Sequence, residues 1–186
     1  MKIEYEDIIL RDMIEKDIED YINWFTKDID WQDYDAPWEK SISEEKEERE
    51  SWTKYYNYSK TIKDNDIRYK FEIEYNGIHI GFVSSYFIDD DYEYISYSSD
   101  KKKYRTIGID ICNKNYRGKG LGELALKAFI NYYINLGINE IYTQTWSGNI
   151  RMIKLATKLG FKECSRKVNT RIVNDKDYDA LTFVLK

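Results

Sequence analysis

The sequence predicts a single α/β domain in which helices flank a mixed, mostly antiparallel twisted sheet. Three observations support this fold class. Two runs that alternate apolar and polar residues, 68–75 and 78–82, surround the hairpin signal Asn76-Gly77. From Gly120 the apolar period becomes that of a helix, and strand-like and helix-like runs then alternate. With 186 residues, of which 42% are hydrophobic, the chain is long enough to bury one core.

The N-terminal part predicts a strand followed by two helices. Residues 8–11 form a short β-prone run, after which apolar side chains recur at helical spacing up to Phe25. Residues 31–38 combine two tryptophans, acidic side chains and the only proline, so they predict a loop. Ser41 and Glu44 have the spacing of a capping box, which predicts a charged helix after this loop.

The remaining elements follow from turn residues and from changes of period. After the hairpin, the acidic turn 89–91 separates a short strand from a longer one, and the helix from Leu121 ends before Gly137. The predicted elements are strands over 93–98 and 104–111, a helix from 121, a strand over 138–145, a helix over 152–159 and two strands around the turn 174–175. No repeat or linker divides the chain, so one domain spanning residues 1–186 is expected.

Composition excludes several classes of function. A net charge of −5 would repel a phosphate backbone, so no nucleic-acid partner is expected. The two cysteines lack CxxC spacing and there is one histidine, so no metal site is expected. No run of eighteen apolar residues and no apolar leader occurs, which predicts a cytoplasmic protein without a membrane partner.

The segment most informative about function is Arg117-Gly118-Lys119-Gly120-Leu121-Gly122, between a predicted strand and a predicted helix. Glycines let a ligand approach the backbone, and a helix N-terminus offers unpaired N–H groups that favour anions. The segment therefore predicts a pyrophosphate site, with Arg117 and Lys119 adding charge. It is neither GxGxxG nor GxxxxGK[ST], which argues against dinucleotide and P-loop sites. The alternative is a glycine turn that only starts a helix.

These residues also match the motif [RQ]-x-x-G-x-[GA], through Arg117, Gly120 and Gly122. A second ordered segment follows at 149–161, and the opening Ile9-Leu10-Arg11-Asp12-Met13 precedes a predicted helix. In these features the sequence resembles the GCN5-related N-acetyltransferase (GNAT) superfamily. It is most similar to the branch that includes ribosomal-protein N-terminal acetyltransferases and some aminoglycoside acetyltransferases. The resemblance is specific over about 107–161 and looser before 104.

The resemblance implies the acyl-CoA N-acyltransferase fold, with acetyl-CoA as cosubstrate and no metal. It divides the domain into acceptor-side elements over 1–103, an acetyl-CoA-binding core over 104–161 and C-terminal strands over 162–186. It further implies that backbone groups near three residues contact the pantetheine arm, namely Ile109, Ile111 and Asn113. The amides of the glycine segment would hold the pyrophosphate, through Arg117, Gly118, Lys119, Gly120, Leu121 and Gly122. Asn149 would contact the cosubstrate, although Asn in this position is also a good helix N-cap.

A carboxylate is expected to remove a proton from the acceptor, because amines are mostly protonated at neutral pH. Asp110 is the leading candidate, since it interrupts the apolar run Ile107-Gly108-Ile109-Asp110-Ile111. The alternative is a solvent-facing strand residue, with Glu93 or Glu72 as the base. Many GNAT enzymes carry a Tyr acid at the position of Ala156. Tyr142, Tyr132 or solvent remain open as substitutes.

The predicted loop 31–38 is the candidate acceptor site. Aromatic faces and carboxylates recognise cations, so Trp31, Asp33 and Asp35, together with Glu93, are expected to bind substrate. The alternative for the tryptophans is packing in the core. His79 alternates away from Ile78 and Ile80, so it is expected to be a solvated strand residue.

The function expected from the sequence is direct transfer of an acetyl group from acetyl-CoA to a primary amine within a ternary complex. A small cation such as an aminoglycoside or a polyamine is the expected acceptor, because the N-terminal half is acidic. Two alternatives stay open: acetylation of a protein N-terminus, and a catalytically silent acetyl-CoA-binding module. A monomer or a homodimer is expected.

Overall fold

A computed structural model describes all residues from 1 to 186, and they divide into two compact units. The first unit comprises residues 1–83 and 109–128, and the second comprises 84–108 and 129–186. The elements that run from one unit into the other are β4 (Ile78–Ile88), β6 (Tyr104–Asp110) and α3 (Leu121–Asn135).

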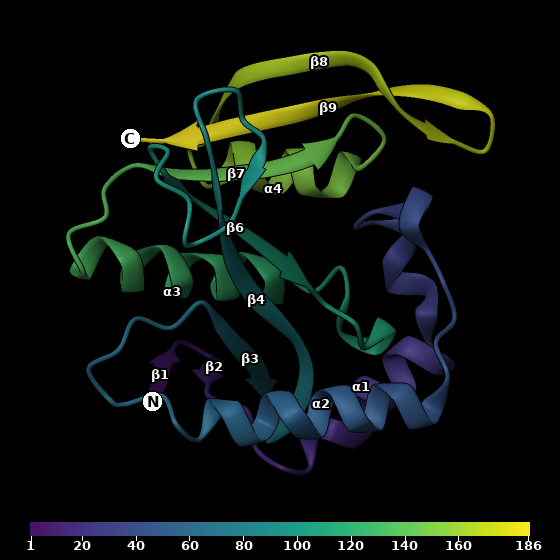
Figure 1. Ribbon diagram of the computed structural model, residues 1–186, viewed down its shortest axis with the longest axis vertical. Helices are drawn as coiled ribbons and strands as arrows, with labels where there is room; N and C mark the ends of the chain where they lie inside the picture. The colour runs from purple at the N-terminus through teal and green to yellow at the C-terminus, as the bar shows by residue number, and fades with distance from the viewer. The chain divides into compact units, whose positions relative to one another are not determined.

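The sheet of the first unit has the strand order β1-β2-β3-β4 (Figure 1). Three of its strands are β1 (Lys2–Tyr5), β2 (Ile8–Arg11) and β3 (Lys70–Tyr75). β2 pairs antiparallel with both neighbours, so that Leu10 lies opposite Ile3 on one side and Ile73 on the other. Leu10 and Ile73 are completely buried. Asn76 and Gly77 have φ angles of 50° and 76°, which confirms the predicted tight hairpin turn between β3 and β4.

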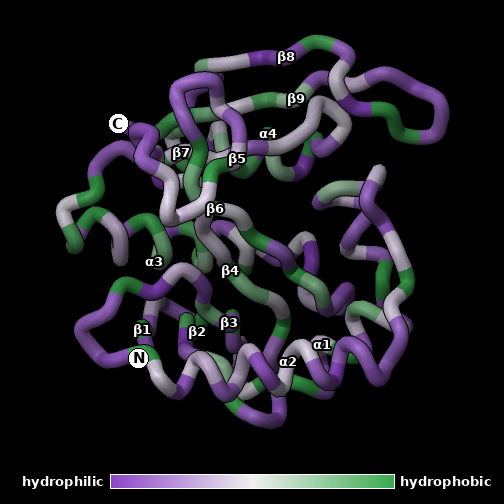
Figure 2. The backbone as a smooth tube through the Cα atoms, viewed as in Figure 1, coloured by the Kyte–Doolittle hydropathy of each residue, from purple (hydrophilic) through white to green (hydrophobic).

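Helices α1 (Asp17–Thr26) and α2 (Glu45–Ser59) belong to the same unit, with the short 3₁₀ helices η1 (Ile29–Asp33) and η2 (Pro37–Glu39) between them. α1 contributes to the main core cluster, whose members are Met13, Ile18, Tyr21, Ile22, Trp24, Trp31 and Cys112. Figure 2 shows that α2 is hydrophilic along most of its length. It contacts the cluster through partly buried aromatic side chains, namely Trp52, Tyr55 and Tyr56.

The predicted helix at α2 is present, but the predicted capping box is wrong. The helix begins at Glu45 with Glu44 at the N-cap position, and no side chain caps it. The backbone N–H of Ser41 instead donates to Oε1 of Gln32 at 2.9 Å. Ser41 is therefore held to η1, four residues before the helix starts.

The strand order that includes the strands of the second unit is β4-β6-β7-β9-β8. Its other strands are β5 (Tyr94–Ile95), β7 (Ile141–Trp146), β8 (Lys162–Val173) and β9 (Lys176–Leu185), with helix α4 (Ile150–Lys158) against β7 (Figure 1). β6 and β7 are parallel, whereas β9 is antiparallel to both β7 and β8. The mixed, mostly antiparallel sheet is thus confirmed. The strand predicted over 93–98 contains only Tyr94 and Ile95.

None of the helices combines the length and the apolar character that crossing a bilayer requires.

Candidate active site

The glycine segment follows β6 and the short helix η3 (Lys114–Tyr116), and it leads into α3. Gly118 and Gly120 adopt left-handed φ angles of 73° and 82°, and both are exposed. A Cβ atom on either glycine would meet no atom within 4 Å, so backbone conformation rather than space requires glycine there. The amides of Leu121 and Gly122 precede the first bond of α3, in which Glu123 N–H donates to the carbonyl of Gly120. The segment thus presents backbone N–H groups at a helix N-terminus.

The guanidinium of Arg117 is bound entirely by protein groups. Its Nε donates to the carbonyl of Ile111 at 2.7 Å, and Nη2 donates to that of Cys112 at 2.5 Å. Two further bonds, at 2.8 and 3.1 Å, reach the carboxylate of Asp30 on η1, and they lower the pKa of that carboxyl. The Arg117 side chain therefore holds the glycine segment to the end of β6 and to η1. The sequence does not indicate this role. Lys119 is exposed, with its Nζ 5.4 Å from the ring centre of Tyr116.

The end of β6 lies directly against β4. A Cβ atom on Gly81 would be 1.9 Å from the carbonyl oxygen of Asp110, so only glycine permits this approach. The N–H of Asn113 donates to the carbonyl of Ile80 at 3.0 Å. Among the backbone groups expected to meet pantetheine, the Asn113 N–H and the Ile111 carbonyl are therefore bonded within the protein.

Two acidic residues singled out separately in the sequence influence each other in the structure. Asp110 is half-buried at the end of β6, and its pKa is raised well above the usual value by burial and by repulsion from Asp35. Lys70 and Arg117 oppose this rise. Asp35 is exposed as a residue, yet desolvation of its carboxyl, followed by repulsion from Glu39, raises its pKa as well. The pKa values of both acids are thus raised, and the negative charge of Asp35 contributes to the rise at Asp110.

His79 is buried, so the prediction of a solvated strand residue is wrong. Its Nδ1 lies 3.0 Å from Oδ2 of Asp20, and its Nε2 lies 3.0 Å from Oε2 of Glu72. The reason is that α1 covers this face of β4, with the ring of Trp24 centred 4.6 Å from the imidazole. Burial alone would lower the pKa of His79, but the hydrogen bonds to Asp20 and Glu72 raise it to about 9. His79 is therefore a charged member of an internal network.

Glu72 belongs to that network. It is 1% exposed, and it also accepts a hydrogen bond from the hydroxyl of Tyr21. Burial would raise the pKa of Glu72, but the positive charges of Lys70 and His79 and the hydrogen bonds lower it. A carboxylate with a lowered pKa is a weak base. Asp110, whose pKa is raised, is therefore a stronger candidate base than Glu72.

Asp17, Asp20 and His79 together offer three potential metal-ligand atoms within 4.8 Å of one another. Cations of the protein already occupy these carboxylates. Arg11 binds both carboxylate oxygens of Asp17 at 2.6 and 2.8 Å, and the imidazole binds Asp20. The absence of a metal site stays a prediction, and the arrangement is that of an internal ion network.

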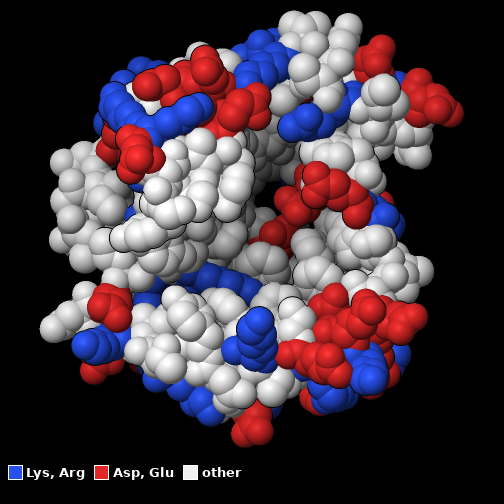
Figure 3. All heavy atoms as spheres, viewed as in Figure 1, with Lys and Arg blue, Asp and Glu red and all other residues white.

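The residues of the predicted acceptor loop have different environments. Trp31 is 6% exposed, and its indole N–H donates to the carbonyl of Trp24 at 2.9 Å, which fits the packing alternative. Asp33 is exposed and pairs with Lys40 at 2.7 Å. Figure 3 shows further acidic side chains over the N-terminal half of α2, where Glu45, Glu47, Glu48 and Glu50 follow the N-cap residue Glu44. The carboxylates of this region are thus accessible to a ligand, whereas the ring of Trp31 is buried.

The candidates in the second unit have structural partners. Oδ1 of Asn149 accepts from the N–H of Met152 at 2.9 Å, so the predicted N-cap of α4 is confirmed. Glu93 forms an ion pair with Lys167. Ala156 is completely buried. The hydroxyl of Tyr142 donates to Glu140 at 2.9 Å, and burial followed by this bond raises its pKa.

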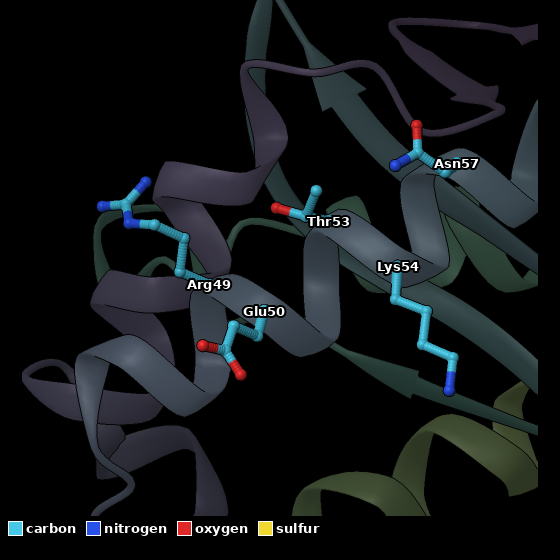
Figure 4. A pocket seen from close by; sticks show the side chains of 5 residues that line it. All are labelled: Arg49, Glu50, Thr53, Lys54 and Asn57. Atoms are coloured by element: carbon cyan, nitrogen blue, oxygen red, sulfur yellow. The ribbon is translucent and has the colours of Figure 1, made fainter.

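A surface depression runs along the outer face of α2 (Figure 4). Its lining residues are Arg49, Glu50, Thr53, Lys54 and Asn57. All five come from one helix, so the depression is a groove between side chains of a single element. Of the residues described above, it contains only Glu50.

Comparisons with known proteins agree with this architecture. The family model described as an acetyltransferase (GNAT) domain matches residues 7–162. Among solved structures, a GNAT-family acetyltransferase from Bacillus anthracis is 17% identical, with a TM-score of 0.72 over 100% of this chain and 98% of that one. No curated protein gives a significant match to the sequence.

Two further similar structures differ in the acceptor that they are named for. A ribosomal-protein-alanine N-acetyltransferase from Brucella melitensis is 16% identical, with a TM-score of 0.67 over 94% of this chain and 97% of that one. A spermidine N-acetyltransferase from Vibrio cholerae, in complex with CoA and spermine, is 20% identical, with a TM-score of 0.68 over 96% and 95%. At these identities the likeness concerns the fold.

Proposed function

The chain belongs to the GNAT acetyltransferase family, whose members are acetyl-CoA-dependent N-acetyltransferases, and from that premise we propose that its acceptor is a small polycationic amine. An aminoglycoside or a polyamine has the required chemistry, a primary amine together with further positive charges. The observation that carries this proposal is the repulsion by which Asp35 raises the pKa of Asp110.

An ammonium group bound near the two carboxyls would offset this repulsion. Such a ligand favours the ionised forms of both acids, because a nearby opposite charge lowers the pKa of a carboxyl. The acidic residues of α2 and the exposed Asp33 add negative charge to the same unit. A molecule with several separated ammonium groups matches this distribution better than one with a single charge does.

The glycine segment fits the diphosphate of acetyl-CoA. Left-handed Gly118 and Gly120 leave the backbone open, the amides of Leu121 and Gly122 lie at the N-terminus of a 15-residue helix, and Lys119 adds a cation. Arg117 would act indirectly, by holding the segment in place. When bound, acetyl-CoA supplies the acetyl group as a reactive thioester.

The chain's own residues would then orient the acceptor and move its proton. Asp35 and Asp110 would hold the ammonium, and Asp110 would accept a proton from the amine nitrogen before or during attack. A carboxyl with a raised pKa suits this task, since proton transfer is most effective when the pKa of the base lies near the working pH. Lys70 and Arg117 keep that pKa from rising further.

A protein N-terminus is the competing acceptor, and the similar solved structures include enzymes named for either kind. A panel of aminoglycosides, polyamines and short peptides, assayed by release of free thiol from acetyl-CoA, separates the two. Turnover that prefers the polycations supports the proposal, and turnover that prefers the peptides contradicts it.

Asp35→Asn tests the proposed binding site of the acceptor. The KM for the best polycation should rise several-fold, while the KM for acetyl-CoA changes little, and the effect should shrink at high salt because exposed charges are then screened. Asp64→Asn is the matched control, since Asp64 is also an exposed acid of the first unit but does not contribute to the pKa shift of Asp110. Equal effects of the two substitutions would remove Asp35 from the acceptor site.

A further inference from the structure

The amine of Lys70, at the start of β3, lies among aromatic rings. Its Nζ is 4.2 Å from the ring centre of Tyr21, 4.3 Å from that of Trp52 and 4.4 Å from that of Phe82. A fourth ring, that of Tyr55, is centred 5.1 Å away. Faces of aromatic rings attract cations at such distances, so the four rings form a cage around the amine.

The cage supplies few hydrogen-bond acceptors. The only carboxylate within 4.0 Å is Glu72, whose Oε1 is 3.9 Å from Nζ, beyond hydrogen-bonding distance. The other oxygen of Glu72 is engaged by Tyr21 and His79. The Lys70 side chain is only 14% exposed. Burial lowers the pKa of its amine, so the neutral, nucleophilic form is more accessible than in an exposed lysine.

The cage is connected to the candidate base through β4. Phe82, one wall of the cage, follows Gly81, where a Cβ atom would lie 1.9 Å from the carbonyl oxygen of Asp110. Cys112, two residues beyond Asp110, belongs to the same core cluster as Tyr21. The charges of Lys70 and Asp110 affect each other's pKa. An amine that resembles the expected acceptor is therefore built into the protein where its charge acts on Asp110.

We propose that Lys70 is itself an acetyl acceptor, modified by the chain's own activity when acetyl-CoA is bound and no small amine is present. This inference rests on the proposed function. Neutral Nζ attacks the thioester carbonyl, forming the C–N bond, while the proton on nitrogen passes through a water molecule to Asp110. The C–S bond breaks, its electron pair leaves with sulfur as CoA thiolate, and the thiolate takes up a proton.

Acetylation of Lys70 would change the acceptor site. The amide carries no charge, so the cage loses its cation, and Asp110 loses one of the two positive charges that lower its pKa. The modified site would be more negative and would have no internal amine to compete with the substrate. Modification would therefore increase the attraction for a polycationic acceptor.

The test follows acetyl occupancy lysine by lysine. The full chain is incubated with acetyl-CoA and sampled over time by peptide mass spectrometry. Lys70 should gain its acetyl group at least about tenfold faster than Lys54, an exposed lysine of α2 that measures uncatalysed acetylation. A saturating polycationic amine should slow the reaction at Lys70 but not at Lys54. Modification of Lys70 no faster than of Lys54 would overturn the inference.

Asp110→Asn provides a second comparison. It should reduce acetylation of Lys70 to the rate at Lys54, and binding of acetyl-CoA by calorimetry verifies that the variant is folded. An unchanged rate at Lys70 in a variant that binds acetyl-CoA contradicts the proposed step. Turnover of small amines, measured in the same samples, distinguishes the two proposals. Turnover without Lys70 modification overturns only this inference, whereas absence of any amine turnover contradicts the proposed function.

Discussion

At the scale of single residues, the environment of Asp110 makes its substitution informative. Asp110→Asn retains size and polarity but cannot accept the proton of the amine. We expect kcat/KM to fall by about 10²–10⁴-fold near neutral pH, with little change in acetyl-CoA affinity. Higher pH should partly restore activity, because more of the acceptor is then neutral. A loss below about threefold with an unaltered pH profile would make Asp110 a structural residue.

The buried His79 predicts a pH-dependent stability. Its pKa is raised from 6.5 to about 9 in the folded chain, so the stabilisation is complete below about pH 6.5 and is lost as pH rises through about 9. His79→Gln cannot carry the charge. Urea unfolding should show a difference between wild type and variant that is larger at pH 6 than at pH 9.5, by roughly 3 kcal/mol. A difference independent of pH would show that the imidazole is not charged in the folded state.

The sequence identifies reactive residue types more readily than their surroundings. Asp110 is conspicuous because it interrupts an apolar run, and Asp35 because it lies in an acidic aromatic segment. The effect of Asp35 on the pKa of Asp110 depends on the fold of the chain, which no local pattern encodes. Likewise, alternation along β4 gives the face of His79 but cannot tell that α1 covers this face.

At the scale of elements, two matched substitutions can distinguish loss of ligand binding at the glycine segment from the backbone strain of replacing a left-handed glycine. Gly120→Glu should greatly weaken acetyl-CoA binding in calorimetry, because a charged side chain at a left-handed position would disturb the proposed diphosphate site. Gly77→Glu is the matched control, since Gly77 has a similar φ of 76° and equally open surroundings, but lies in the hairpin turn. Unchanged affinity in folded Gly120→Glu would exclude the segment as the binding site.

The junction of β4 and β6 predicts another contrast between two glycines. Gly81→Ala would place a Cβ atom 1.9 Å from the Asp110 carbonyl oxygen, so it should destabilise the chain by at least about 2 kcal/mol. Gly108→Ala should cost less than about 1 kcal/mol, because its Cβ would lie 3.8 Å from the Ser84 hydroxyl, an ordinary contact. Urea unfolding of both variants measures the difference. Similar midpoints would show that the strands are not this close.

Elements with strong local signals are those that the sequence predicts well. The Asn76-Gly77 hairpin and the helix after Gly120 depend on turn residues and period, and the structure has both. The capping box at Ser41 is wrong because a distant partner, Gln32, holds that backbone. The ion pair between Arg117 and Asp30 could not be anticipated either, since its partners lie in elements far apart along the chain.

At the scale of the whole molecule, the fold class depends on the order of helices and strands more than on the percentage of identical residues. Solved structures that are 16–20% identical have TM-scores of 0.67–0.72 over nearly the entire chain. The sequence could predict that order because buried strands, turns and an amphipathic helix need only residue classes at given spacings. Identifying the acceptor needs particular side chains, and for these the spacing carries much less information.

The two cysteines differ in exposure, so their reaction with a thiol reagent can report conformational opening of the chain. Cys164 is exposed, whereas Cys112 is completely buried and burial raises the pKa of its thiol. A thiol-specific alkylating reagent should label Cys164 in the native state and Cys112 only during transient opening of the first unit. Acetyl-CoA at about 100 times its Kd should slow labelling of Cys112 by about 100-fold if opening requires release of the ligand, and leave Cys164 unaffected. Pulse alkylation would thereby report opening of the first unit, to which the glycine segment belongs, without an introduced label.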